Sequence, residues 1–379
     1  MQKLRLTIFS FLSFLMVFSP LCAHGAEMIQ DKQEILKAKV IEIVDEGKRT
    51  SPGIDKELLY QNIKAEILDG EEKGTIISIE NDYTQLKDGQ KFYILKITRS
   101  DDGKVTYVVH DVDRIPWLIF FFLLFIIVVV IFGGVQGIRG LLSLFGGMFL
   151  IFYVLLPQIV GGASPLLVSI LVASLIVVVG SYITHGFNRT TSSAVIGMVI
   201  TVVLTGLLAS WAVSATTLSG MDNEEAMYLS LNSYGAIDLG GLLMGGIIIG
   251  LLGVLYDSAI GQAISVEELW RAKPELSKKY VFKRALRIGR EHIGALVNTL
   301  AIAYVGASLP LLVLFAFPDA VSTRFIINRE LFATEIIRAL IGSIGLVLAV
   351  PITTAISVWM LHGKKFKGHV HSHSHGHLK

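Results

Sequence analysis

This sequence has very little cysteine and an unusually small share of charged residues. Cys22 is the only cysteine in 379 residues, and it lies in a segment that we expect to be removed as a signal peptide. A mature chain without cysteine would have no disulfide, no thiolate metal site and no cysteine nucleophile. Charged residues make up only 17% of the chain against 53% hydrophobic residues, and the mean hydropathy is +0.63. This composition is too apolar for an ordinary soluble domain and indicates a polytopic membrane protein.

The motifs of several enzyme classes are also missing. The chain has no P-loop and no dinucleotide fingerprint. Tyr256-Asp257 matches one half of an intramembrane aspartyl protease site, but no second span supplies the Gly-x-Gly-Asp whose carboxylate would share the proton. Gly161-Gly162-Ala163-Ser164 stands at the end of an expected span, with no histidine at a suitable depth to activate the serine. We expect no enzymatic activity, no cofactor and no nucleic-acid partner.

Residues 1–26 have the pattern of a signal peptide. Lys3 and Arg5 precede an apolar core over 6–21, and small residues follow at 23–26. An uncleaved anchor is the alternative. A lipoprotein is less favoured because Leu21 stands before Cys22, where a small residue is expected.

Residues 27–113 have the composition of a soluble domain. Strand-like alternation occurs over 39–44, 76–79 and 92–97, and Asp-Gly turn signals stand at 68–70, 87–89 and 101–103. We predict a small extracytoplasmic β-rich domain, built as an antiparallel sheet or barrel.

Residues 114–361 are expected to form an α-helical membrane domain of about seven transmembrane helices. Most of the apolar runs approach the roughly 20 residues that a span needs. They cover about 116–134, 141–160, 165–185, 191–217, 238–261, 292–317 and 334–361. The first two runs are so close together that a re-entrant hairpin is a rival interpretation.

The positive-inside rule orients these spans. If the β-domain is exported, the loops between spans on the outer side carry only Arg324 and Arg329, and the acidic loop 221–225 is also outside. The inner side then holds Arg139, Arg189, Arg271, Lys273, Lys278, Lys279, Lys283, Arg284, Arg287, Arg290, Lys364, Lys365, Lys367 and Lys379. We therefore expect a multi-pass protein of a bacterial-type cell membrane, with its N-terminal domain outside and its C-terminus in the cytoplasm.

The inner segment 262–290 is predicted to be amphipathic. Ser265 and Glu268 fit a capping box that would start a short helix, and Pro274 would end it. Residues 278–290 could then lie on anionic inner-leaflet lipids, through a stripe formed by Lys279, Lys283, Arg287 and Arg290. A solvated basic loop that only fixes the topology is the alternative.

Asp257 is the acidic residue placed well inside an expected span. Gly246, Gly250 and Gly253 precede it on the same helix face, so that face is expected to pack against another helix. A carboxylate in hydrocarbon is costly unless it meets protein or water, which makes Asp257 a candidate proton, ion or gate residue. It would lie about 28 Å along the fifth span, near the inner boundary, so an interfacial role is equally open. The neighbouring polar groups are Tyr256, Ser258 and Gln262.

The sixth span contributes further candidates. Gly294 and Asn298 share a face, which predicts helix packing with Asn298 as a polar partner. Glu291 and His292 stand at the inner mouth of the span and could take part in proton transfer, or could simply be interfacial. Pro310 should kink this span. In the last span, Glu335 and Arg338 are expected to form an interfacial ion pair.

The C-terminal segment 362–379 is basic and rich in histidine. Alternating imidazoles could bind zinc, nickel or copper weakly, through His369, His371, His373, His375 and His377. A low-complexity tail with incidental metal affinity is the alternative. No span holds the paired histidine and aspartate that a membrane metal pathway would need.

Two blocks of the chain resemble the YibE/F-like membrane protein family. The first is Gly253-Val254-Leu255-Tyr256-Asp257-Ser258-Ala259-Ile260-Gly261-Gln262-Ala263-Ile264-Ser265-Val266-Glu267-Glu268-Leu269, and the second runs from Gly289 through Asn298 to Pro310. The resemblance covers the expected spans and, more loosely, the β-domain. It implies a membrane protein but carries over no activity.

A weaker, partial similarity is to one half of the resistance-nodulation-division transporters, especially the protein-export pair built on that fold. The resemblance implies that Asp257 matches the proton-carrying aspartate. The chain departs from that pattern because it has no large exported domain after its first span and no acidic residue six positions beyond Asp257.

The sequence therefore leaves two main hypotheses. In the first, the protein is a transporter or proton-coupled export factor that uses Asp257. In the second, it is a non-transporting scaffold or sensor whose exported β-domain binds a ligand or partner. Metal handling through the histidine-rich tail is a minor third.

Overall fold

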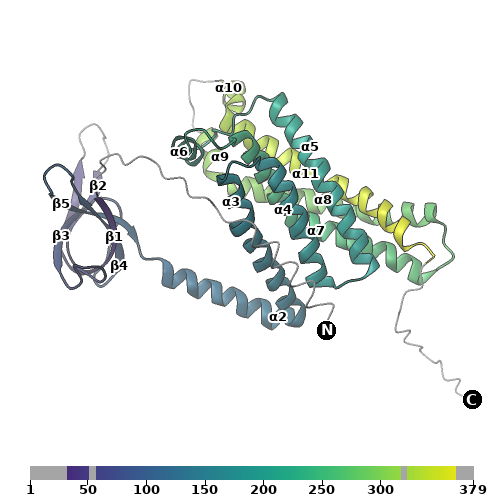
Figure 1. Ribbon diagram of the computed structural model, residues 1–379, viewed down its shortest axis with the longest axis horizontal. Coiled ribbons are helices and arrows are strands. Elements are labelled where there is room, and N and C mark those ends of the chain that lie inside the picture. The colour runs from purple at the N-terminus through teal and green to yellow at the C-terminus, as the bar shows by residue number, and fades with distance from the viewer. Residues whose placement is uncertain (1–31, 51–56, 317–321, 364–379) are drawn as a thin grey trace, which may run out of the picture. The chain divides into compact units, whose positions relative to one another are not determined.

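The computed structural model describes residues 32–50, 57–316 and 322–363 (Figure 1). The chain divides into two compact units, Met1–Val128 and Val129–Lys379. The first unit holds a β-sheet and the second holds most of the helices. The expected signal peptide and the histidine-rich end of the tail lie outside the described residues.

The sheet of the first unit has five antiparallel strands in the order β3-β2-β1-β4-β5. The strands are β1 (Lys32–Thr50), β2 (Glu57–Ile67), β3 (Ile76–Asn81), β4 (Lys91–Thr98) and β5 (Val105–Val112). The three predicted strand patterns fall in β1, β3 and β4, but the patterns did not predict β2 and β5. The three predicted turns are present, and their glycines have the positive φ that favours glycine, 74° at Gly70, 76° at Gly89 and 68° at Gly103.

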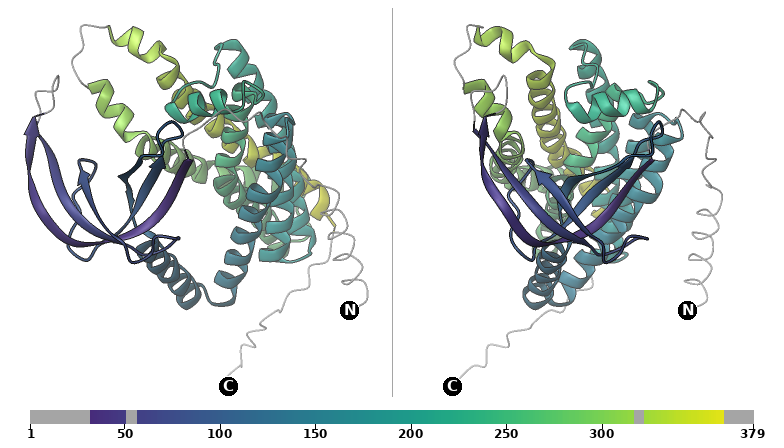
Figure 2. Two further views of the ribbon diagram at one scale, coloured as in Figure 1. Left: turned by 60° about the vertical axis from the view of Figure 1, so that its left-hand side comes forward. Right: turned by 90° about the vertical axis from the view of Figure 1, so that its left-hand side faces the viewer.

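The sheet curves into a half-barrel (Figure 2). Two register shifts along β1, after Val40 and after Ile43, let this long strand bend. Inward side chains at alternate positions fill the concave side, including Leu36 and Phe92. The core is therefore built by the period-2 burial that a half-buried strand requires.

Glu72 links the two ends of the sheet. It lies in the turn between β2 and β3, and its carboxylate accepts hydrogen bonds from Lys96 Nζ at 2.7 Å and from the Tyr107 hydroxyl at 2.8 Å. Lys96 belongs to β4 and Tyr107 to β5. These two donors lower the pKa of Glu72 below its ordinary value.

The rest of the described chain is mostly helical. Its elements are α2 (Ile115–Leu150), the π-helical turn η1 (Ile151–Leu155), α3 (Leu156–Val160), α4 (Pro165–His185), α5 (Arg189–Ala215), α6 (Glu224–Asn232), α7 (Leu239–Ala272), α8 (Lys278–Ala307), α9 (Leu309–Ala316), α10 (Thr323–Asn328) and α11 (Glu330–Leu361). Five helical segments of the described residues are long and apolar enough to cross a membrane. They are Ile115–Val160, α4, α5, α7 and α11.

The first two expected spans lie within the single helical segment Ile115–Val160. Gly134 interrupts it with non-helical angles, φ 54° and ψ −138°. Each side of Gly134 keeps roughly the 20 residues that a crossing needs. The sixth expected span is divided between α8 and α9 at Ser308, just before Pro310, whose ring nitrogen has no amide hydrogen to continue the helical bonding.

The prediction of a capping box at Ser265 is wrong. α7 continues through this position to Ala272, and the Ser265 hydroxyl donates to the Gly261 carbonyl at 2.9 Å. Burial explains the difference, because Val266 and Trp270 extend the buried stripe of α7 and pack in one cluster with Val281 of α8. The helix ends shortly before Pro274, as predicted.

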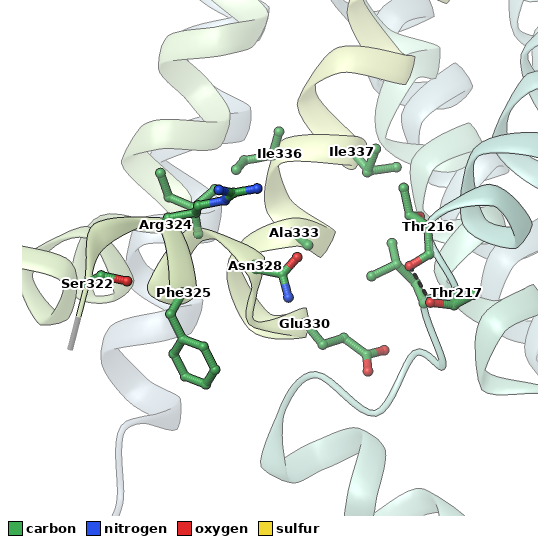
Figure 3. Close-up of a pocket in the computed structure, with 12 residues that line it drawn as sticks. Thr216, Thr217, Ser322, Arg324, Phe325, Asn328, Glu330, Ala333, Ile336 and Ile337 are labelled. Atoms are coloured by element: carbon green, nitrogen blue, oxygen red, sulfur yellow. Dashed lines mark hydrogen bonds between the residues drawn. The ribbon is translucent and has the colours of Figure 1, made fainter.

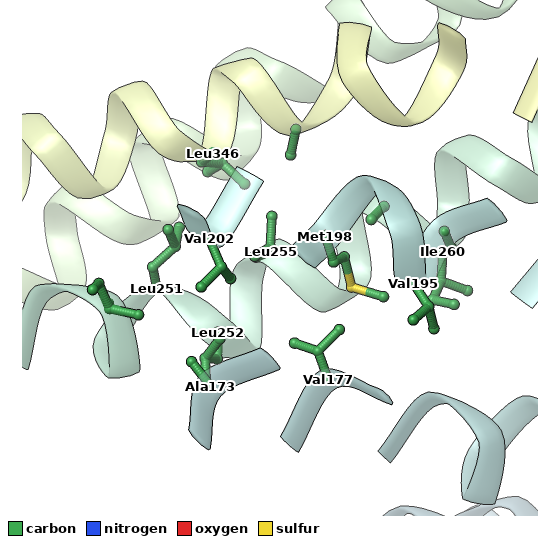
Figure 4. Packing of buried hydrophobic residues seen from close by; sticks show 14 of the residues in the cluster. Ala173, Val177, Val195, Met198, Val202, Leu251, Leu252, Leu255, Ile260 and Leu346 are labelled. Atoms are coloured by element: carbon green, nitrogen blue, oxygen red, sulfur yellow. The ribbon is translucent and has the colours of Figure 1, made fainter. Parts of the chain in front are cut away.

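α7 lies at the centre of the helical unit. Its buried side chains, such as Leu251 and Leu255, pack with residues of α4, α5, α8 and α11 in the largest apolar cluster (Figure 4). Hydrogen bonds tie the helix ends together. Glu267 of α7 accepts from Thr190 at the start of α5, and Glu330 at the start of α11 accepts from the backbone amides of Ser219 and Gly220, after α5.

Candidate functional site

Asp257 lines a pocket between α7, α8 and α11. The pocket has a volume of about 180 Å³. Its walls are formed by Asp257, Ser258, Gly261, Gln262, Ser265, Gly289, His292, Leu296 and Val350. Four candidates from the sequence, Asp257, Ser258, Gln262 and His292, are therefore brought to one place.

Helical spacing explains how these side chains meet. Asp257, Gly261 and Ser265 follow one another at intervals of four on α7, and Gly289 and His292 are three apart on α8, so each set shares a face. Gly289 allows the two helices to approach closely. A Cβ atom at this position would collide with Gln262 and with Val350.

Gln262 holds the inner wall of the pocket. It is only 4% exposed, and its amide nitrogen donates both to the Ala285 carbonyl and to Thr354 Oγ1, each at 2.8 Å. These bonds connect α7 to α8 and to α11. The side-chain oxygen of Gln262 faces Gly289 and the pocket, so this residue positions the site and still offers an acceptor.

Ser258 and Asp257 each place in the pocket a polar group that has no partner among the described residues. Ser258 is 8% exposed, and its hydroxyl has no hydrogen-bond partner among the described residues. The Asp257 side chain is exposed, and it forms neither a hydrogen bond nor an ion pair within the described part of the chain. A buried hydroxyl that lacks a partner is costly, so the Ser258 hydroxyl is free to bond to water or to a ligand in the pocket.

Tyr256 points away from the pocket and toward α4. Its hydroxyl donates to the Gly180 carbonyl of α4 at 3.4 Å, and its ring centroid lies 5.8 Å from that of His185. His185 also lies within electrostatic range of Asp257. The sequence gives no signal for His185 as a neighbour of Asp257, because no spacing rule connects two residues that are brought together only by the packing of α4 on α7.

Two other candidates lie outside the pocket. Glu291, although adjacent to His292, lines a different cavity of about 530 Å³ beside the start of α8. Asn298 is exposed and makes no hydrogen bond with a described residue. The expected interhelical partner for Asn298 is therefore not found, and a Cβ at the companion Gly294 would meet nothing within 4 Å.

Most of the predicted glycine face of α7 has no close neighbour within the described chain. Gly246 and Gly253 are exposed, and a Cβ at either would meet nothing within 4 Å. Gly250 alone has a close neighbour, the Tyr304 hydroxyl, at 3.3 Å from such a Cβ. The close helix contacts are made by other glycines, such as Gly245 against Ser169, because the bulky side chains of α7 direct the opposite face into the core.

A larger cavity lies at the other end of the helical unit. It has a volume of about 850 Å³ and is lined by residues from the end of α5, α10 and α11 (Figure 3). The one carboxylate in its lining, Glu330, already accepts hydrogen bonds from the backbone amides of Ser219 and Gly220. The smaller pocket at Asp257 is therefore the better candidate for chemistry. No group of three or more potential metal ligands occurs in the part of the chain that the structure describes.

Comparison with known families decides what this chain is. The model of the YibE/F-like protein family matches residues 121–363, which is most of the chain and includes every residue of the Asp257 pocket. The chain belongs to this family. No curated protein and no solved structure matches this YibE/F-like protein, so the weaker likeness to the resistance-nodulation-division transporters stays a prediction.

Proposed function

We propose that this YibE/F-like protein is a transporter or proton-coupled export factor in which Asp257 binds and releases the proton or cation. The observation that carries the proposal is the pocket that places the Asp257 carboxylate beside the partnerless Ser258 hydroxyl, Gln262 and His292. A carboxylate within an apolar helix is expected to serve such a role. His292 lines the same pocket and could take part in proton transfer there.

The open glycine face gives the site a way to change shape. Gly246 and Gly253 leave the α7 surface free of contacts beyond the pocket, while Gln262 ties α7 to the start of α8. In this proposal α8 tilts about the Gln262 connection and closes on α7. The pocket at Asp257 then opens and closes as the two helices move.

The proposed topology has seven crossings, with the β-domain outside and the C-terminus in the cytoplasm. Gln136 lies just after the bend at Gly134, and its side chain donates to the Thr184 carbonyl at the end of α4, at 3.3 Å. This contact supports two crossings before α4, because it brings the bend to the same end of the unit as the end of α4. The division of α8 and α9 at Ser308 supports a sixth crossing that is kinked.

The test is labelling with a hydrophobic carbodiimide, which reacts with protonated carboxyl groups in apolar surroundings. We expect the purified full-length protein to be labelled at Asp257. Asp257→Asn should abolish the labelling and should also abolish proton uptake by proteoliposomes that hold an internal pH dye.

Glu268→Gln is the matched control, because Glu268 lies on the same helix, is 62% exposed in its side chain and is absent from the pocket. This variant should keep both signals. Labelling and proton uptake that are unchanged in Asp257→Asn would refute the proposal.

A further inference from the structure

The cavity of about 530 Å³ beside the start of α8 combines positive charge with apolar walls. Its charged lining residues are Lys273, Arg284, Arg287 and Glu291. Three cations and one carboxylate face the cavity, so its net charge is positive. Its volume is within the range of pockets that hold small molecules.

The cations of this cavity form no ion pair with a carboxylate in the part of the chain that the structure describes. Lys273, Arg284 and Arg287 form no ion pair with a described residue, whereas Arg271 is held by Glu267 at 2.6 Å. Arg284 is instead oriented by Tyr280. Its Nε atom donates to the tyrosine hydroxyl at 3.1 Å, and its guanidinium lies 5.3 Å from the ring centroid. An oriented guanidinium without a carboxylate is a good donor for a phosphate.

The face of α8 that lines the cavity differs from the basic stripe that the sequence predicted. Tyr280, Arg284, Arg287 and Ile288 recur at helical spacing and line the cavity together. Lys279, Lys283 and Arg290, which the sequence grouped into one basic stripe with Arg287, lie outside it. The apolar stripe that includes Val281 and Ala285 is covered by α7 and α11, so it is not free to enter lipid.

We propose that this cavity binds the phosphate of an anionic phospholipid, with Arg284, Arg287 and Lys273 around the headgroup. Leu269, Leu276 and Ile288 line the same cavity and would contact the first part of an acyl chain. The cavity lies at the end of α7, a helix apolar enough to cross a membrane, where headgroups are found. A free phosphate ion has the same charged chemistry but would gain nothing from the apolar walls. The inference is independent of the role proposed for Asp257.

The experiment measures the binding of tail-labelled phosphatidylglycerol to the full-length protein in a neutral detergent, by fluorescence anisotropy. The variant Arg284→Gln with Arg287→Gln should weaken binding at least about tenfold, since two headgroup contacts are lost. The control, Lys279→Gln with Lys283→Gln, removes the same charge from the same helix outside the cavity and should change binding less than about twofold.

Three results would overturn the proposal. Equal weakening by the two double variants would mean diffuse attraction to a basic surface, and unchanged binding in both would mean that the cavity is not used. Displacement of the lipid by millimolar inorganic phosphate would identify a free-phosphate site instead.

Phosphatidylcholine with the same label should bind more weakly than phosphatidylglycerol. Circular dichroism should show equal helix content in both double variants. If the Arg284→Gln, Arg287→Gln variant does not fold, the variant Arg287→Lys, which keeps the charge, should fold and retain part of the affinity.

Discussion

At the scale of single residues, the side chain of Gln262 connects three helices, because it extends from α7 and donates hydrogen bonds to α8 and α11. The sequence predicted only that it lies near Asp257. The structure shows a buried amide that donates to α8 and to α11 while its oxygen faces the pocket. Asp257 itself is exposed and unpaired within the described chain, so the geometry of the site depends on Gln262 rather than on the carboxylate.

Gln262→Leu should destabilise the helical unit by about 1–3 kcal/mol, because the Ala285 carbonyl and the Thr354 hydroxyl lose a buried partner. Gln136→Leu is the control, since Gln136 is exposed and makes one long bond of 3.3 Å. Thermal unfolding of the full-length protein in detergent would measure both variants. A loss of stability in Gln136→Leu as large as in Gln262→Leu would contradict this account.

At the scale of elements, the packing of helices depends on which glycines face a neighbour. Gly197 of α5 lies directly against Thr353 of α11, whereas Gly253 of α7 faces open space. Both lie inside apolar helices, so the sequence does not tell them apart.

Gly197→Ala should therefore lower the unfolding temperature, because its Cβ would collide with the backbone and side chain of Thr353, an overpacking that costs about 1–3 kcal/mol. Gly253→Ala should leave the unfolding temperature unchanged or raise it, since alanine favours a helix over glycine by about 1 kcal/mol. The same thermal unfolding assay measures both variants. A lower unfolding temperature for Gly253→Ala than for Gly197→Ala would show that another group covers the α7 surface at Gly253.

The half-barrel is an element whose closure should depend on pH. The pKa of Glu72 is lowered by Lys96 and Tyr107, so its contribution to stability is present above the ordinary glutamate pKa of about 4.3 and is lost as the pH falls through the lowered value. Hydrogen exchange of β4 and β5, measured on the full chain by mass spectrometry, should therefore accelerate in acid. Glu72→Gln should already exchange faster at neutral pH, and Glu71→Gln should not.

At the scale of the whole molecule, the described chain consists of a small sheet and a larger helical unit. Hydrogen bonds connect the ends of helices that alternate in direction, such as the start of α5 with the end of α7. The proposed orientation of these ends can be tested because the chain has only one native cysteine.

In a Cys22→Ser background, a cysteine at Asn223 should react with a membrane-impermeant maleimide in intact cells. Cysteines at Ile138 and at Lys278 should react only after the membrane is permeabilised. Ile138 follows the bend at Gly134, so its labelling distinguishes two crossings from a re-entrant hairpin. Labelling of the Ile138 variant in intact cells, or no labelling after permeabilisation, would contradict the seven-crossing topology.

The sequence by itself determined the class of the protein, the family and the place of most elements. These follow from local properties, because apolar runs of about 20 residues predict helices, alternation predicts strands, and Asp-Gly pairs predict turns such as that at Gly89. The same local rules failed at Ser265, where burial of Val266 and Trp270 outweighs the capping signal.

Only the tertiary structure decided which of the polar residues meet. Asp257 and His292 are 35 positions apart in sequence, and the contact of α7 with α8 brings both into one pocket, whereas Glu291 and Tyr256, each next to one of them, turn away. A helix rotates by about 100° per residue, so neighbours in sequence face different partners. Local pattern therefore fixed where the helices are, and the burial of their bulky faces fixed which glycines, cations and carboxylates remain accessible.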